Sequence, residues 1–424
     1  MAPRLRLGLV AADADFRRFW ASRGVSALGD GVGSLALPLV AVLLLGASSW
    51  EMGVLRAAAT TPALLLSLAA GVWVDRLRRR PVMIVADLGR AALLLTVPLA
   101  AALGALRIEL LWAVALSAGV LTLLYDLAWT SFVPSLVARQ RLVEANGTLQ
   151  ATTSASFAAS SGAAGWLVQA VGAPLALIVD AASYLCSAAI LFGVRAVEPP
   201  ARTPGAPRAG MRAEIAEGIA LVWRDPILRW MVLLTAVGSF SGALHGAVLV
   251  LYAVRGLLLA PSALGIVLGA GALAGVAGAA LAGITSRLLG IGGALVAGTG
   301  LIVFGQALAP LAGAAHGGAF VADLDPGALV LLAGQILFGL GMAVYSVNQI
   351  SLRQAMVAPH VLGRVNATRR FLVFGIQPIG ALVGGALGDS LGLQHTLVVA
   401  AAIQLVALAA LIASPLSRVT DGTA

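Results

Sequence analysis

Residues 76–104 read RLRRRPVMIVADLGRAALLLTVPLAAALG, a cluster of arginines followed by an apolar stretch. A helix that crosses a bilayer needs about 20 predominantly apolar residues, and this stretch supplies them. The same alternation runs along all 424 residues, of which 60% are hydrophobic and 11% charged, with a mean hydropathy of +0.98. Because a soluble domain has no interior large enough for so much apolar surface, the pattern predicts an all-α integral membrane protein.

Twelve apolar stretches of this kind are predicted to span the membrane. They cover residues 20–45, 52–74, 82–104, 110–133, 146–170, 173–194, 227–253, 262–285, 291–312, 327–350, 366–388 and 394–414. Only the gap after the sixth stretch is long and polar. It begins with VEPPARTPGAPRAG, which is typical of a flexible linker, and continues with MRAEIAEGIALVW, which predicts an amphipathic surface helix. The predicted domains are an N-terminal six-helix bundle at 1–195, a cytoplasmic linker at 196–225 and a C-terminal six-helix bundle at 226–424.

The distribution of arginines predicts how the chain is oriented. All 27 basic residues are arginines, and 22 of them lie in alternate gaps between the predicted helices or at the chain ends. The opposite gaps hold only Arg56, Arg107 and Arg255. Positive segments resist translocation, so the arginine-rich side and both termini are predicted to be cytoplasmic. The net charge of +9 therefore indicates membrane topology and not nucleic-acid binding.

The two predicted bundles contain matching sequences. SFVPSLVARQRLVEANGT, from Ser131, aligns without gaps with SLRQAMVAPHVLGRVNAT, from Ser351. The identical pairs include Val137/Val357, Ala138/Ala358, Leu142/Leu362, Asn146/Asn366 and Thr148/Thr368. Because each copy has an even number of helices, the copies are parallel repeats related by an axis along the membrane normal. The sequence therefore predicts two pseudo-symmetric bundles around a central cavity.

The loop GVWVDRLRRR at residues 71–80 resembles the signature of the major facilitator superfamily, Gly-x-x-x-Asp-Arg-x-Gly-Arg-Arg, at the same place between the second and third helices. The matching residues are Gly71, Asp75, Arg76, Arg79 and Arg80, and Arg78 replaces the second glycine. The resemblance covers essentially the whole chain and is nearest to bacterial 12-span drug and siderophore exporters, such as macrolide efflux proteins and the enterobactin exporter. It also rests on FRRFW at 16–20, Gly29-Asp30, ANGT at 145–148 and IVDAASYL at 178–185.

This resemblance implies a transporter of the bacterial inner (plasma) membrane that has no enzymatic activity. It also implies a charge latch at the cytoplasmic helix ends, which holds the outward-open state. We expect the five matching loop residues to form this latch with charged residues of neighbouring helices, namely Asp87, Arg90 and Asp126. The alternative is that the loop arginines only enforce topology.

Asp30 lies near the middle of the first predicted span, within LGDGVGSLALP. A carboxylate at such a depth costs about 2.5–3.5 kcal/mol on insertion scales, so it should face protein or water. Arg23 lies two turns earlier on the same helical face and is the expected counter-charge. Asp30 and Arg23 are therefore our candidates for proton coupling. The alternative is a structural Asp30, bonded to neighbouring backbone or hydroxyl groups.

Other intramembrane polar residues are expected to line the cavity or to support the structure. The candidates for the cavity wall are His245, Gln335, Tyr345, Asn348 and Gln349. Asp180 is expected to bond to Ser183 or Tyr184, and Asp389 to be a charge on the outer surface. The scattered histidines and the single cysteine lack metal-ligand spacing, so neither a metal nor a cofactor is expected.

These features predict secondary active transport: proton-coupled efflux of a small amphipathic organic compound, such as a drug, macrolide or siderophore-like molecule, by alternating access. Import or uniport of a small solute and lipid flipping are the alternatives. ATP-driven transport is disfavoured because the chain has no Gly-x-x-x-x-Gly-Lys-Ser/Thr loop. The expected partners are the substrate, protons and bilayer lipids, without nucleic acid, and we expect a monomer.

Overall fold

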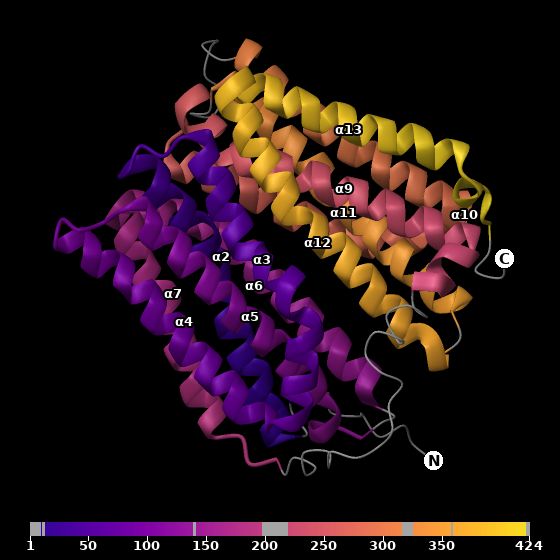
Figure 1. Cartoon of the computed structure of the whole chain (residues 1–424), viewed down its shortest axis with the longest axis horizontal. Helices are drawn as coiled ribbons and strands as arrows, with labels where there is room; N and C mark the ends of the chain where they lie inside the picture. Colours follow the sequence, from indigo (N-terminus) through magenta and orange to yellow (C-terminus); the bar gives the residue numbers. More distant parts are fainter. Residues whose placement is uncertain are drawn as a thin grey trace, which may run out of the picture.

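A computed structural model describes residue 10 and residues 13–138, 141–196, 219–315, 325–357 and 359–420. Within these ranges, the side chains of residues 67–76, 143, 359–364 and 366–367 are excepted. The described chain forms helices joined by short connections (Figure 1). The helix predicted for the linker begins outside the described residues, but residues 219–224 are helical, with Val222 fully buried and Ile219 42% exposed.

The N-terminal half consists of six long helices, which lie together in Figure 1. They are α2 (Ala14–Leu43), α3 (Ser49–Arg76), α4 (Arg79–Ala102), α5 (Ile108–Leu136), α6 (Leu142–Val171) and α7 (Ala173–Phe192). α2 begins where the sequence supplies a cap. The Asp13 carboxylate accepts a hydrogen bond from the backbone N–H of Phe16 at 2.8 Å and so caps α2.

The C-terminal half forms the second group. It contains α9 (Pro226–Leu251), a π-helical turn (Tyr252–Gly256), α10 (Pro261–Ala315), α11 (Pro326–Met356), α12 (Pro359–Leu391), α13 (Leu393–Ala413) and a 3₁₀ turn (Pro415–Arg418). The 55-residue α10 is two helices that meet at Gly290, whose φ of 72° breaks the helical path. The twelve predicted spans therefore all fall on helices, six in each half. Within the described residues, nine helices, counting α10 once, are long and apolar enough to cross a membrane.

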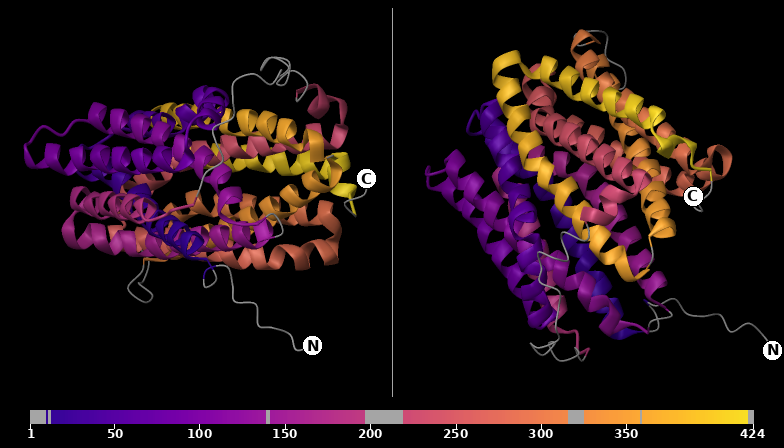
Figure 2. Two further views of the ribbon diagram at one scale, coloured as in Figure 1. Left: turned by 90° about the horizontal axis from the view of Figure 1, so that it is seen from below. Right: turned by 45° about the vertical axis from the view of Figure 1, so that its right-hand side comes forward.

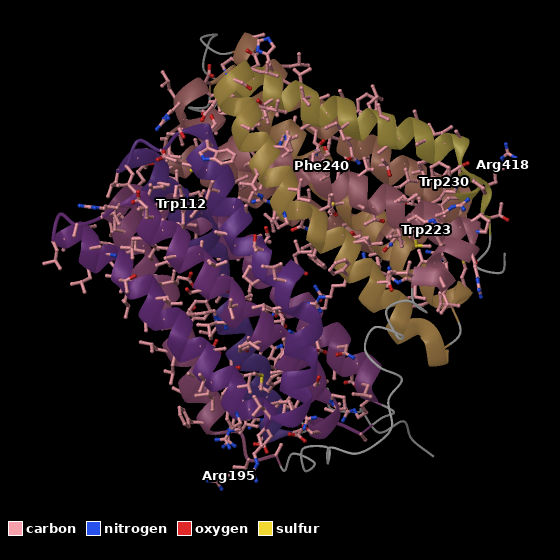
Figure 3. All side chains as sticks on the ribbon, in the orientation of Figure 1. Trp112, Arg195, Trp223, Trp230, Phe240 and Arg418 are labelled. Atoms are coloured by element: carbon pink, nitrogen blue, oxygen red, sulfur yellow. The ribbon has the colours of Figure 1, made fainter. Side chains whose placement is uncertain are left out.

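The two halves touch near one end of the molecule, which we call the closed end. There α3 packs on α12, and α6 packs on the first part of α10. Glycines allow these contacts: a Cβ at Gly53 would lie 2.7 Å from the Ala381 carbonyl oxygen, and one at Gly265 would lie 2.8 Å from Gly165 Cα. Toward the other end, where α2 begins and α13 ends, the halves diverge (Figures 1 and 2). Figure 3 places Arg195 and Arg418 at this open end, one on each half.

Asp389 links the two halves at the closed end. Its carboxylate, near the end of α12, accepts hydrogen bonds from the backbone N–H groups of Ser49 at 2.9 Å and Trp50 at 3.2 Å. These are the first residues of α3, so an acidic side chain of one half caps a helix of the other. Asp389 is exposed at this end, as predicted for a surface charge. The sequence does not show that it also caps α3, because this depends on the start of α3 meeting the end of α12.

The last described residues bind back to the break in α10. The backbone N–H of Gly292 donates to the Val419 carbonyl at 2.7 Å, and that of Ile291 donates to the Thr420 carbonyl at 3.4 Å. Gly292 has no room for a side chain, since a Cβ there would lie 2.4 Å from the Ser417 carbonyl oxygen. The chain end is thus fixed to the turn between the two parts of α10.

Candidate functional site

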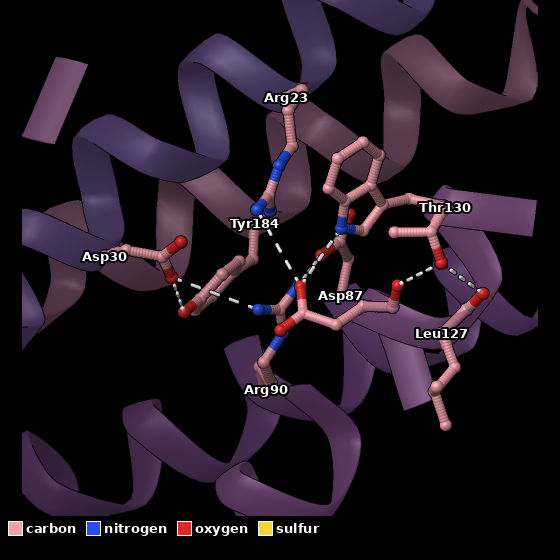
Figure 4. Close-up of polar contacts among 9 residues, drawn as sticks. Arg23, Asp30, Asp87, Arg90, Leu127, Thr130 and Tyr184 are labelled. Atoms are coloured by element: carbon pink, nitrogen blue, oxygen red, sulfur yellow. Dashed lines mark hydrogen bonds and ion pairs between the residues drawn. The ribbon is translucent and has the colours of Figure 1, made fainter. Parts of the chain in front are cut away.

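A charged cluster lies inside the N-terminal half, between α2, α4 and α7 (Figure 4). The Tyr184 hydroxyl of α7 donates a hydrogen bond to the Asp30 carboxylate of α2 at 2.5 Å. The Arg90 guanidinium of α4 lies 3.9 Å from the same carboxylate oxygen. The Asp30 side chain is still 34% exposed. We call Asp30, Asp87, Arg90 and Tyr184 the Asp30 cluster. Asp30 is the partly exposed one of its two carboxylates.

Asp87 is the second carboxylate of the Asp30 cluster, and it is fully buried. Arg90 donates a short hydrogen bond to one of its oxygens, and the Ser187 hydroxyl donates to the other at 2.7 Å. The Arg90 guanidinium also lies over the rings of Tyr184, at 4.1 Å, and Tyr125, at 4.7 Å. The buried Arg90 is therefore balanced by two carboxylates, the fully buried Asp87 and the partly exposed Asp30.

Arg23 does not lie beside Asp30, so the predicted pairing of these two residues is wrong. Its guanidinium is 3.7 Å from the Asp126 carboxylate and lies over the Tyr125 and Trp129 rings, at 5.4 and 5.2 Å. Two helical turns separate Arg23 from Asp30 by about 10 Å, and the aromatic rings of α5 draw the Arg23 side chain away. The counter-charge of Asp30 is Arg90, which comes from another helix.

The residues predicted to form a cytoplasmic latch fall into separate places. Asp87 and Arg90 belong to the Asp30 cluster and Asp126 pairs with Arg23, so these three lie within the bundle and not at a loop. Arg80 donates to the carbonyls of Leu191, at 2.8 Å, and Phe192, at 2.5 Å, at the end of α7. Cations at a helix C-terminus are favourable, so Arg80 caps α7. Arg79 is half-buried next to it.

Three further latch residues, Gly71, Asp75 and Arg76, have side chains outside the described residues. The backbone at these positions forms the last part of α3. Their part in a latch therefore stays a prediction.

Asp180 of α7 is 3% exposed and faces the glycines of α2. A Cβ at Gly33 would lie 1.9 Å from its carboxylate, so only a glycine leaves room for it. The expected bond to Ser183 is found, because the Ser183 hydroxyl donates to the Asp180 main-chain carbonyl at 2.8 Å, whereas Tyr184 donates to Asp30. Asp180 Oδ1 has no hydrogen-bond partner in the described part of the chain.

A cavity of about 1040 Å³ lies between the two halves, and we call it the inter-half cavity. Its walls come from α2 and α6 on one side and from α10 and α11 on the other. Large apolar side chains such as Phe157, Phe338 and Met342 line it, with Gln335 as one of its polar groups. Ser34, one helical turn from Asp30, is also in its wall. The Asp30 cluster thus lies next to this cavity.

A second cavity of about 390 Å³ lies within the C-terminal half, and we call it the C-terminal cavity. It shares Phe338, Met342 and Ser346 with the inter-half cavity, so the two adjoin. Arg56 reaches its wall from α3, which belongs to the other half. The cavity wall also contains Arg369 and no described carboxylate. Its polar character is therefore cationic.

The five predicted cavity residues have different positions. Gln335 lines the inter-half cavity, while Tyr345 and Gln349 line the C-terminal cavity, where the Tyr345 and Thr235 hydroxyls are 2.8 Å apart. Asn348 is in neither wall. Its amide donates to the carbonyls of Val344, at 2.9 Å, and Ala282, at 3.3 Å, and so joins α11 to α10.

His245 is also absent from both cavity walls. It is 5% exposed, and its ring is stacked on Phe338 with the centroids 6.4 Å apart. The neighbouring Gly246 faces the Arg56 guanidinium, since a Cβ there would lie 2.8 Å from Arg56 Cζ. In the part of the chain that the structure describes, no three His, Cys, Asp or Glu side chains are grouped as metal ligands.

Among the residues of the C-terminal cavity that sequence reasoning missed are Arg56, Arg369, Gln306 and Gln404. Arg56 was assigned to an outer gap, although it lies inside the predicted span 52–74. A charge within a span is itself a sign of a functional position, and this signal would have found Arg56. The two glutamines carry no charge, and a single sequence gives no sign that they face a cavity.

Two helical bundles with an interior cavity and an intramembrane charged cluster define a multi-pass membrane transporter. The model of the Major Facilitator Superfamily matches residues 19–367, and the chain therefore belongs to that superfamily. Its members move small molecules across membranes, and the chain is accordingly a transport protein and not an enzyme.

The curated relatives are multidrug efflux pumps. The chain is 26% identical over 377 residues to the multidrug efflux pump Tap of Mycolicibacterium fortuitum, a match that covers 87% of this chain and 88% of the pump. It is 27% identical over 386 residues to the pump of the same name from Mycobacterium tuberculosis (strain ATCC 25618 / H37Rv), with 88% and 86% covered.

Solved structures share the fold. The nucleoside transporter NupG has a TM-score of 0.70 at 14% identity, with 94% of this chain and 98% of that chain covered. A bacterial homologue of the iron transporter ferroportin has a TM-score of 0.72 in its inward-facing state, at 18% identity, with 96% and 99% covered. The outward-facing state of that homologue has a TM-score of 0.57, at 18% identity, with 94% and 98% covered. These likenesses show that the fold is shared.

Proposed function

We propose that this protein exports a small amphipathic organic compound from the bacterial cytoplasm in exchange for protons, as a monomer in the inner membrane. The observation that carries the proposal is the Asp30 carboxylate, which is partly exposed and bound to Tyr184 and Arg90 beside the inter-half cavity. A carboxylate that can hold or release a proton at such a place can couple proton entry to cargo exit.

The two carboxylates around Arg90 support a division of roles. Asp87 is fully buried and hydrogen-bonded by Ser187 and Arg90, so we assign it as the enclosed partner of that cation. Asp30 can take up a proton without leaving Arg90 unpaired, because Asp87 remains. Protonation then weakens the contact between α2 and α4, which gives the N-terminal half two states that differ by one proton.

Two features support export as the direction of transport. The arginine-rich ends of the helices are expected to be cytoplasmic, and the halves diverge toward this side (Figure 1). The inter-half cavity is then open to the cytoplasm, where an exporter loads its cargo. The multidrug efflux pumps related to this chain support export over import.

Flux measured in proteoliposomes with an imposed pH gradient tests the coupling. We expect Asp30→Asn to abolish pH-driven transport of an amphipathic dye such as anilinonaphthalene sulfonate, because the amide cannot release a proton. Exchange of the dye without a gradient should persist. Glu144→Gln is the matched control, since this carboxylate pairs with Arg141 on the exposed surface. Full pH-driven flux in Asp30→Asn would overturn the proton-coupling role of Asp30.

A further inference from the structure

The C-terminal cavity holds two positive charges that lack a described counter-charge. Arg56 is exposed into the cavity and Arg369 is half-buried in its wall. No carboxylate of the described residues forms an ion pair with either of them, or with the nearby Arg353. A cation within the membrane-spanning part of a protein is costly unless it faces water or a partner of opposite charge. These arginines can therefore bind an anion that is not part of the chain.

Two buried glutamines in the wall of the same cavity carry further hydrogen-bond donors. Gln306 is 1% exposed, and its oxygen accepts a hydrogen bond from Ser241 at 3.1 Å. Gln349 is 2% exposed, and its oxygen accepts from Arg353 at 3.2 Å. These bonds fix each amide so that its NH₂ group remains free, and neither Nε2 atom has a partner in the described chain. A buried donor without a partner costs stability, so an acceptor atom of a bound ligand would stabilise both amides.

The position of Arg56 connects this cavity to the movement of the two halves. Arg56 belongs to α3, but its guanidinium lies against Gly246 of α9, where a Cβ would be 2.8 Å from Arg56 Cζ. Arg369, Gln306 and Gln349 belong to the C-terminal half. A ligand held by all four groups therefore bridges the two halves, and it is released when the halves separate at this point.

We propose that the C-terminal cavity binds an oxyanion, such as a carboxylate or sulfonate, carried by an amphipathic molecule whose apolar body lies in the inter-half cavity. Arg56 and Arg369 supply charge-assisted hydrogen bonds, and the amides of Gln306 and Gln349 supply neutral ones. The apolar body contacts Phe338 and Met342, which both cavities share. This inference rests on the proposed export function and narrows its cargo to amphipathic anions.

A pair of dyes that differ only in the anionic group tests the proposal. Anilinonaphthalene sulfonate carries a sulfonate, and N-phenylnaphthylamine has the same apolar body without it. We would measure binding of each dye by equilibrium dialysis to the full-length protein in phosphatidylcholine nanodiscs, and subtract binding to empty nanodiscs. We expect Arg56→Gln and Arg369→Gln each to weaken binding of the sulfonate dye about tenfold. Binding of the neutral dye should not change, which also shows that the variants are folded.

Two further variants sharpen the result. Arg255→Gln removes the same charge from an exposed position at the closed end and should leave both dyes unaffected. Arg56→Lys keeps the charge and should lose less affinity than Arg56→Gln. Equal losses for the two dyes, no loss in either cavity variant, or the same loss in Arg255→Gln would overturn the proposal.

The source of the oxyanion is decided by a second set of nanodiscs that contain phosphatidylglycerol. Displacement of the sulfonate dye by this lipid identifies a lipid headgroup as the occupant, and undisturbed binding identifies a soluble amphipathic anion. Dye binding requires neither a gradient nor turnover. Loss of the anion preference with intact proton-driven efflux would thus refute only this inference, while anion binding without efflux would refute the proposed function.

Discussion

The two halves of this transporter share an architecture but differ in how they treat buried charge. In the N-terminal half, Arg90 is enclosed with its own carboxylates, Asp30 and Asp87. In the C-terminal cavity, Arg56 and Arg369 have no described carboxylate beside them. A cation with an internal partner can respond to a proton, whereas a cation without one can respond to a ligand. In the two proposals above, the N-terminal half therefore couples protons and the C-terminal cavity binds cargo.

The largest expected effect comes from breaking the internal pairing of the N-terminal half. Removing one member of a buried ion pair costs about 3–5 kcal/mol, because the remaining charge is uncompensated. We expect Asp87→Ala to lower the free energy of unfolding by about this amount, measured by unfolding in mixed detergent micelles. Asp15→Ala, at a half-exposed position, is the control. If Asp87→Ala is as stable as the wild type, Asp30 alone balances Arg90.

The next largest effect is expected when a substitution places a carboxylate in the C-terminal cavity. In Gln349→Glu the new charge lies in the same wall as Arg369, so the cavity supplies its own anion. We expect binding of anilinonaphthalene sulfonate to weaken at least about tenfold, the effect of about 1.4 kcal/mol. Equilibrium dialysis in nanodiscs measures this, with Gln335→Glu in the inter-half cavity as the comparison. Stronger binding of the anion would contradict a cationic cavity.

A smaller effect is expected where the two halves meet at the closed end. Asp389→Asn weakens the cap that α12 provides for α3, and a cap of this kind is worth about 1 kcal/mol. The balance between the two states should then shift about fivefold away from the arrangement described here. Distances between spin labels across the open end report this shift, in a background in which the exposed Cys186 is replaced by serine.

Asp225 provides the matched control for this shift. Its carboxylate accepts hydrogen bonds from the backbone N–H groups of Ile227, at 2.8 Å, and Leu228, at 3.0 Å, so it caps α9 within one half. Asp225→Asn should cost similar stability without changing the label distances. An identical shift in both variants would mean that the cap of α3 does not hold the closed end.

The smallest effect is expected for Arg23→Gln. Because Arg23 interacts with Asp126, Tyr125 and Trp129 and not with Asp30, pH-driven flux in proteoliposomes should be almost unchanged. The loss of cation–π contacts should cost about 0.5–1 kcal/mol of stability. If pH-driven flux is lost in this variant, Arg23 takes part in proton coupling, as its sequence position predicted.

The fold could be predicted from the sequence because the thickness of the bilayer fixes the length of apolar sequence that each spanning helix needs. Apolar length fixes the spans, and even the two helices merged in α10 were separated correctly around Gly290. Asp30 was identified for a similar reason, since a carboxylate at mid-span is costly wherever the helix packs.

The partners of these residues could not be predicted, because they depend on which helices become neighbours. Arg90 was singled out as charged, but its place beside Asp30 depends on how α2, α4 and α7 pack, for which Gly33 must accommodate Asp180. Sequence position shows that Arg23 and Asp30 share a face, but not that aromatic rings of α5 hold the Arg23 side chain. Likewise, nothing in the sequence shows that Arg56 crosses from one half to the cavity of the other.

The bonds between Gly292 and Val419 have a practical meaning for anyone who handles this protein. An affinity tag or fluorescent fusion that replaces residues after Arg418 would remove a backbone pairing that secures the turn at Gly290. Such a fusion would loosen the joint between the two parts of α10, one of which packs against α6 of the other half. Reporters should therefore be attached beyond Thr420, where they leave this pairing intact.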